Sequence, residues 1–181
     1  MLKPTLFLSI LPSALAAAPL TGHIYALLYP NINLPSSSSL NSIGCLNALG
    51  QLTLSDCAVF SHTPSGYGTL STAAGNCTFN DKKAPENADS LFKGYAWTCG
   101  EHLEVEEKEN YYLGPVENWT DEFKLLGNGN LRFFYDVPAL PATEEDKIPV
   151  WRYLWGSAQV GVPEEHHRIG LLWVKTEKKG V

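Results

Sequence analysis

The sequence predicts an all-β fold, a small barrel or sandwich of short antiparallel strands stapled by disulfides. Three observations lead to this prediction. Short runs of β-branched and aromatic residues recur along the chain, bounded by Gly, Pro, Asn or Asp. No long segment shows the 3.6-residue apolar period of an amphipathic helix. The chain has 4 cysteines, none in a Cys-x-x-Cys pair, and this even set is typical of disulfides rather than of a metal site.

The N-terminus is typical of a secretory signal peptide. Lys3 supplies the positive charge, an apolar run follows from Thr5 to Leu11, and the small residues of Ala14 to Ala16 fit a cleavage site. The run is too short for a transmembrane helix, which needs about 20 apolar residues. We therefore expect a signal peptide over residues 1–16, a secreted, extracellular protein without a membrane span, and a single β domain over residues 17–181.

The strand-like segments of the mature chain follow one another at the short spacing of sandwiches and barrels. Pro-, Ser- or charge-rich loops separate some of them, at residues 30–42, 80–90 and 138–149. In order, the predicted strands lie within residues 23–29, 51–54, 57–61, 66–72, 76–80, 94–99, 122–127, 130–136, 150–155 and 168–175.

The four cysteines allow three pairings. Sequential pairing, Cys45 with Cys57 and Cys77 with Cys99, closes the shortest loops and is the pairing that we favour. Each bridge is expected to stabilise the fold by about 2–4 kcal/mol.

Other sequence features limit the modifications, ligands and cofactors that we expect. Asn76 and Asn118 begin sequons and are candidate N-glycosylation sites in a secretory pathway. The formal net charge of −6 disfavours binding to nucleic acid, which needs a basic surface. A Gly-rich phosphate loop, a Gly-x-Ser-x-Gly elbow and a His-x-x-x-His motif are absent from the sequence, so we expect no cofactor and no metal.

Two clusters carry groups suited to acid–base catalysis. His166 and His167 lie in "PEEHHR", where the preceding Gly and Pro favour a solvated turn over a functional site. Glu104 and Glu106 would share one face of a strand, and glycoside hydrolysis needs such paired carboxylates, but a run this acidic favours a solvated sheet edge. An enzyme is therefore the less favoured hypothesis.

The stretch "VWRYLW" carries the candidate binding residues. With a period of two, Trp151, Tyr153 and Trp155 share one face of a strand. They can form an exposed platform for stacking sugar rings or bases. Alternatively they pack in the core, which we favour because large aromatics dominate the buried area of small domains.

The landmarks "GCL", "CAVF", "SGYGTLSTAAGNC" and "WTCG", between Gly44 and Gly100, form a recognisable string, and "FFYDVP" follows at residues 133–138. This string resembles the C-terminal accessory domain of fungal secreted ribonucleases of the ribonuclease T-two family. The resemblance implies a secreted β domain with two cysteine pairs. The histidine motifs of that family's catalytic domain do not occur in this sequence, so the resemblance implies no ribonuclease activity.

These observations predict a secreted, glycosylated β domain without catalysis that binds cell-wall polysaccharide or a host extracellular component. Nucleic acid is a disfavoured partner. One alternative is a small secreted hydrolase that uses the acidic or the His/Glu cluster. The other is an effector or an allergen-like secreted β-barrel, since fungal proteins of the Alternaria major-allergen type share the "W-x-C-G" pattern.

Overall fold

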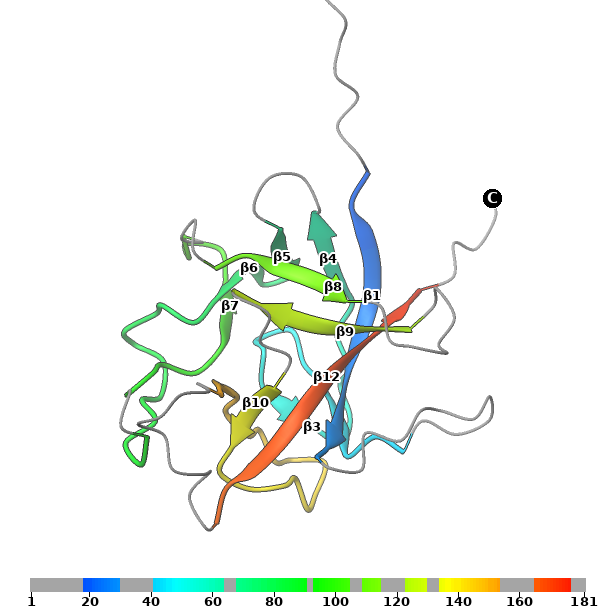
Figure 1. Cartoon of the computed structure of the whole chain (residues 1–181). Helices are drawn as coiled ribbons and strands as arrows, with labels where there is room; N and C mark the ends of the chain where they lie inside the picture. The colour runs from blue at the N-terminus through cyan, green and yellow to red at the C-terminus, as the bar shows by residue number, and fades with distance from the viewer. Residues whose placement is uncertain are drawn as a thin grey trace, which may run out of the picture.

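The structure, a computed structural model, describes residues 18–29, 41–63, 68–90, 93–104, 109–114, 123–129, 134–153 and 165–176. These residues form strands and turns without any helix, and the strands pair in antiparallel fashion (Figure 1). The predicted all-β, disulfide-stapled fold is confirmed. The proposed signal peptide lies outside the described residues.

The strands of the described residues belong to one sheet. Its main path runs in the order β11-β10-β12-β1-β4-β5-β6-β7, with β2 and β3 attached to β1 and with β9 and β8 attached to β12. The bounds are β1 (Leu20–Leu28), β2 (Gly44–Leu46), β3 (Leu52–Thr53), β4 (Phe60–Thr63), β5 (Thr69–Thr72), β6 (Gly75–Thr78), β7 (Thr98–Gly100), β8 (Tyr111–Gly114), β9 (Phe123–Asn128), β10 (Phe134–Val137), β11 (Trp151–Arg152) and β12 (His167–Lys175).

The two longest strands, β1 and β12, form the centre of the sheet. They pair from Gly22 opposite Lys175 to Leu28 opposite Ile169, and Figure 1 shows them crossing the middle of the molecule. Successive residues of β12 from Ile169 to Trp173 are buried. Burial of consecutive residues means that both faces of this strand are covered, as expected for a strand at the heart of a curled sheet.

The ends of the sheet come together. The backbone N–H of Trp97, just before β7, donates to the carbonyl of Val150, just before β11, at 2.7 Å. Leu52 on β3 and Ile148 exchange two further backbone hydrogen bonds, of 2.8 and 2.9 Å. The Trp97–Val150 bond joins the segments next to the first and last strands of the main path, and the Leu52–Ile148 bonds tie β3 to the segment before β11. The sheet therefore encloses its core in a barrel-like manner.

Stacked aromatic rings fill this core. Trp97 lies at their centre, with ring centroids 5.7 Å from both Phe79 and Tyr111 and 5.9 Å from Phe60. Tyr135 adds another ring, 6.5 Å from Trp97. Burial raises the pKa of Tyr111 and of Tyr135 well above the usual value for a phenol, and the charge of Glu109 adds to the effect on Tyr111.

Two disulfides staple the sheet. Cys45–Cys57 and Cys77–Cys99 have Cα–Cα distances of 5.4 and 4.0 Å, so the predicted pairing is confirmed. Gly44, which precedes Cys45 of the first bridge, has a φ of 147°. A Cβ at this position would lie 2.4 Å from the carbonyl oxygen of Thr53. The bridges indicate an oxidising, extracellular environment. No helix suited to crossing a membrane is formed by the described residues.

Candidate ligand-binding site

Within the described part of the predicted aromatic strand, regular pairing covers Trp151 and Arg152, and Val150, Trp151 and Tyr153 are buried. Trp151 and Tyr153 are each 6% exposed, and Trp155 lies outside the described residues. The Trp151 indole N–H donates to the carbonyl of Pro85 at 3.0 Å, and the Tyr153 ring lies 4.7 Å from the Arg168 guanidinium carbon. Trp151 and Tyr153 therefore do not form an exposed platform, because neighbouring segments cover both rings.

The side chain of His166 is buried, so the prediction of a solvated turn is wrong for this side chain, although Glu165 before it is exposed in a turn. Its side chain is 5% exposed, and its ring stacks on Trp151 at a centroid distance of 5.8 Å. Its Nδ1 lies 3.0 Å from Oδ1 of Asp136, and its Nε2 lies 3.5 Å from Oδ2 of the exposed Asp89. His167 follows at the start of β12 and is half-buried.

The remaining predicted residues divide between surface and undescribed segments. Glu104 is exposed, while Glu106 lies outside the described residues. Asn76 is exposed on β6, where its side-chain nitrogen donates to the carbonyl of Leu103 at 3.3 Å. The second sequon, at Asn118, also lies outside the described residues.

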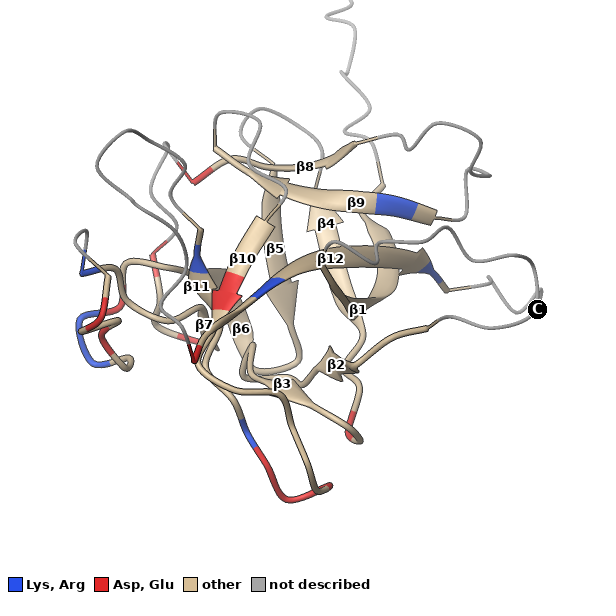
Figure 2. Cartoon of the chain, turned by 60° about the horizontal axis from the view of Figure 1, so that its bottom comes forward, with Lys and Arg blue, Asp and Glu red and all other residues tan. Residues whose placement is uncertain are grey.

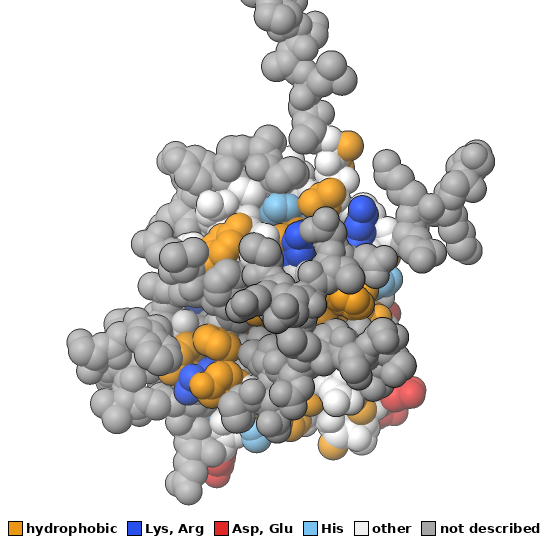
Figure 3. Space-filling model, turned by 45° about the vertical axis from the view of Figure 1, so that its right-hand side comes forward, with side chains coloured by type: hydrophobic (Ala, Val, Ile, Leu, Met, Phe, Trp, Pro, Cys, Tyr) orange, Lys and Arg blue, Asp and Glu red, His pale blue; other side chains and the backbone are white. Residues whose placement is uncertain are grey.

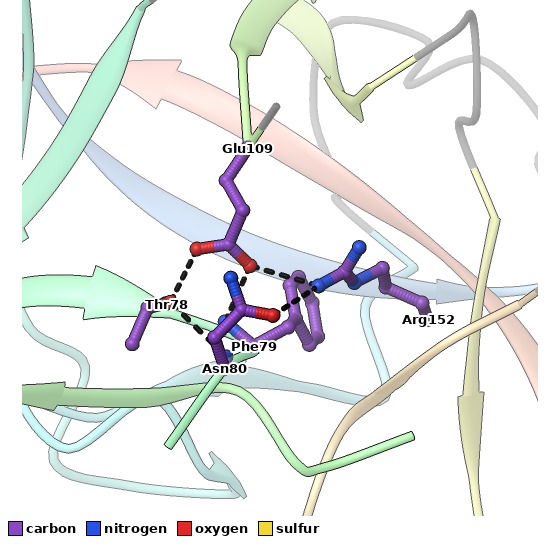
Figure 4. A network of polar contacts seen from close by, with 5 residues as sticks. All are labelled: Thr78, Phe79, Asn80, Glu109 and Arg152. Atoms are coloured by element: carbon purple, nitrogen blue, oxygen red, sulfur yellow. Dashed lines mark hydrogen bonds and ion pairs between the residues drawn. The ribbon is translucent and has the colours of Figure 1, made fainter. Parts of the chain in front are cut away.

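A buried carboxylate, Glu109, connects β6 to β11 through its hydrogen bonds and ion pair. Its side chain is fully buried and forms an ion pair of 2.9 Å with Arg152 of β11. It also accepts hydrogen bonds from the Thr78 hydroxyl and, at 2.8 Å, from the backbone N–H of Phe79 (Figure 4). Burying a carboxylate is costly unless it is paired and hydrogen-bonded, and these donors meet that requirement.

Arg152 extends this network toward the surface. Its side chain is 24% exposed, its guanidinium lies 4.9 Å above the Phe79 ring, and it donates to Oδ1 of Asn80 at 3.3 Å (Figure 4). Because a guanidinium only donates, this contact identifies which end of the Asn80 amide faces Arg152. The other end, Nδ2, is buried without a hydrogen-bond partner.

A second buried carboxylate holds the segment between β6 and β7 against the sheet. Asp136 of β10 is 1% exposed and accepts a 2.8 Å hydrogen bond from Nδ2 of Asn87. Figure 2 shows this acidic position on β10, whereas most other charges lie in loops. Asn87 is 3% exposed, and its Oδ1 has no hydrogen-bond partner. Asp136 thus connects Asn87 to His166 through its two oxygens.

The two networks border the same pocket, which has a volume of about 200 Å³. An unpartnered amide donor, on Asn80, and an unpartnered amide acceptor, on Asn87, therefore belong to residues of one pocket wall. Buried polar atoms without partners are uncommon in folded proteins, so a pocket that borders two of them is a candidate site for a polar ligand. The pocket is lined by Phe79, Asn80, Asn87, Ser90, Gly94, Tyr95, Trp151 and Arg152.

A more open pocket, of about 370 Å³, lies between β1, β4, β8 and β9. Its wall includes Leu20, His62 and Lys124, and Figure 3 shows hydrophobic, His and basic side chains in small groups near the described start of the chain. His62 is 4% exposed, and its Nε2 lies 3.0 Å from the Tyr111 carbonyl oxygen. This pocket also borders buried polar atoms without a hydrogen-bond partner, Nδ1 of His62 and the hydroxyl of Tyr111. We regard the first pocket as the better candidate site because it is less open and combines an unpartnered amide donor with an unpartnered amide acceptor.

Sequence reasoning missed the polar residues that build the site. Asp136 had a usable signal, because a carboxylate inside the aromatic run "FFYDVP" indicates a buried charge. Glu109 and Asn87 lie in polar stretches that resemble solvated loops, so no local signal distinguished them. Within the described residues, no group of three His, Cys, Asp or Glu side chains is arranged to hold a metal ion.

Comparison with known protein families, curated proteins and solved structures gives no match. The resemblance to ribonuclease accessory domains therefore stays a prediction from the sequence landmarks. The assignment of a function has to come from the site itself.

Proposed function

We propose that this protein is a secreted, non-catalytic binding module that holds a small neutral polar ligand in the Asn80–Asn87 pocket. The observation that carries this proposal is the pair of unpartnered amide atoms, Nδ2 of Asn80 and Oδ1 of Asn87, at one pocket. Each unmade buried hydrogen bond costs about 1–3 kcal/mol, which a ligand that supplies the missing partners recovers.

The charges around the pocket support a neutral ligand. Glu109 neutralises Arg152, which is the one basic residue among the described residues of the pocket wall. The overall formal charge of −6 further disfavours strongly acidic ligands. A neutral carbohydrate segment meets both conditions and agrees with the predicted polysaccharide partner.

The burial of Glu109 supports binding rather than catalysis. This carboxylate is fully buried, and Thr78, Phe79 and Arg152 occupy its oxygens. A general acid or base must reach the proton that it transfers. Secretion is supported by the N-terminal signal-like pattern and by the two disulfides.

Titration by NMR tests the proposal. A panel of neutral oligosaccharides with different sugar residues is added to the 15N-labelled protein, and the resonances of Tyr95 and the Trp151 indole are followed. We expect at least one sugar to shift these resonances saturably, without matching shifts at Leu49, which lies outside the pocket. A complete lack of pocket shifts across the panel would contradict the proposed function.

A second candidate function, hydrolysis, is favoured by one observation. Asp136 lies 3.0 Å from Nδ1 of the buried His166, and a carboxylate in this position orients a histidine for general base catalysis. Incubation with RNA and with polysaccharides between acid and neutral pH tests this alternative. Turnover that disappears in a His166→Ala variant, with the fold retained, would establish it and overturn the binding module.

A further inference from the structure

The Asn80–Asn87 pocket offers one unpaired donor and one unpaired acceptor. Asn80 keeps its Nδ2 free because Oδ1 accepts from Arg152, and Asn87 keeps its Oδ1 free because Nδ2 donates to Asp136. Neither amide is free to exchange its two ends, since each is oriented by a charged neighbour of fixed polarity. The ligand must therefore bring one acceptor and one donor.

A secondary amide has this complement. Its carbonyl oxygen accepts a hydrogen bond, and its N–H donates one. Such a group bound here would accept from Nδ2 of Asn80 and donate to Oδ1 of Asn87. The two asparagine atoms are shielded from bulk water in the structure, so each amide would have to turn toward the pocket for the ligand to reach it.

The rest of the pocket wall suits an acetamido group on a sugar. Tyr95 contributes a partly exposed aromatic ring, the largely buried rings of Phe79 and Trp151 border the same space, and Gly94 has no side chain to fill it. Aromatic rings pack against methyl groups and against the apolar faces of pyranose rings. Gly94 has no atom within 4 Å of an added Cβ, so there is open space beside it.

We propose that the pocket recognises the acetamido group of an N-acetylhexosamine residue in an oligosaccharide. This inference rests on the proposed binding function and specifies its ligand class. The Asn80 and Asn87 amides recognise the acetamido group, while the aromatic wall contacts the methyl group and the sugar ring. A hydroxyl group at the same position of the sugar lacks both the methyl group and the second polar atom of the amide.

Calorimetric titration with three β-1,4-linked trisaccharides tests this specificity. The sugars carry an acetamido group, a free amine or a hydroxyl group at carbon 2 and are otherwise alike. We expect the acetamido sugar to bind about tenfold or more tightly than the other two, because a site built to hydrogen-bond one group leaves atoms unpaired with its analogue.

A matched pair of variants locates the effect. Asn80→Asp keeps the acceptor for Arg152 and replaces the Nδ2 donor with an acceptor, so the affinity for the acetamido sugar should fall about tenfold. Asn47→Asp makes the same chemical change at a buried asparagine outside the pocket and should leave the affinity unchanged within about twofold. Thermal melts of both variants report whether the fold is retained.

The outcomes separate the ligand class from the binding function. Equal affinity for the three trisaccharides, or unchanged affinity in Asn80→Asp, would overturn the acetamido assignment and leave the proposed function standing. If none of the three sugars binds but another sugar of the NMR panel shifts the pocket resonances, the acetamido assignment is likewise overturned and the proposed function stands. No binding by any sugar would overturn both. If Asn80→Asp does not fold, the side-chain NH2 resonances of Asn80 in the unaltered protein decide, since the acetamido sugar alone should shift them.

Discussion

The two disulfide loops differ in where their buried asparagine side chains find hydrogen-bond partners. The first loop, residues 45–57, contains one buried asparagine, Asn47, whose hydrogen-bonding capacity is used within the loop. Its Oδ1 accepts from the backbone N–H groups of Leu49 and Gln51 at 3.0 Å, and its Nδ2 donates to Oε1 of Gln51 at 3.2 Å. The buried asparagine side chain of the first loop is therefore satisfied within the loop, although the backbone of Leu52 also pairs with Ile148. The loop exposes Leu49 and Leu54 to solvent.

The second loop, residues 77–99, depends on the rest of the sheet. Its Asn80 and Asn87 bond to Arg152 and Asp136, and each keeps one unpartnered atom. The two disulfides thus differ in what they hold. The Cys45–Cys57 bridge closes a short loop whose buried asparagine bonds within the loop. The Cys77–Cys99 bridge joins the paired strands β6 and β7 and anchors both ends of a longer segment that carries polar groups to a pocket.

The largest expected effect comes from removing the aromatic support of the second loop. Trp151→Ala should cost about 3–5 kcal/mol of unfolding free energy, because it removes a buried ring and leaves a cavity against His166 and Pro85. Leu49→Ala, the matched change in the first loop, should have almost no effect because Leu49 is 52% exposed. Urea unfolding measures both. A loss below about 1 kcal/mol for Trp151→Ala would contradict the packing described here.

The next effect concerns the ion pair behind the pocket. Arg152→Met should destabilise the protein by about 3 kcal/mol, because Glu109 would stay buried without its counter-charge. The double variant Arg152→Met/Glu109→Gln should recover much of that loss, since it removes both charges together. Chemical denaturation of the parent, both single variants and the double variant gives the coupling energy. A double variant that is no more stable than Arg152→Met would show that the unpaired charge is not the cause.

The smallest effect is a change in alkaline stability. The pKa of Tyr135 is raised by burial, so above about pH 10 the unfolded chain loses this phenolic proton while the folded protein keeps it. Stability is therefore fully present below pH 10 and declines as the pH rises further. Tyr135→Phe should make this decline shallower, at a cost of about 1 kcal/mol at pH 7 for the lost hydrogen bond to Leu126. Unfolding curves from pH 7 to pH 11 measure both changes, and an equally steep decline in the variant would refute the assignment.

Much of the fold could be predicted from local patterns. The β-rich runs between turn residues predicted most strands, and the even cysteine set with its short sequential loops predicted the pairing. Two strands were missed. Gly44–Leu46 resembled a turn because of its glycine, and Tyr111–Gly114 follows an acidic run that dominated the local composition. The aromatic strand was predicted over residues 150–155, but regular pairing in the described part is limited to Trp151 and Arg152.

The fold class and the disulfide pairing follow from the sequence alone, because alternation, turn chemistry and cysteine spacing are local properties. Which polar residues are buried depends on contacts between segments far apart in the chain. Asp136 meets Asn87 from 49 positions away and His166 from 30, and Arg152 meets Glu109 across 43. Whether a carboxylate or an amide is solvated or held in a pocket depends on such distant partners, since burial is tolerated only where they complete its hydrogen bonds.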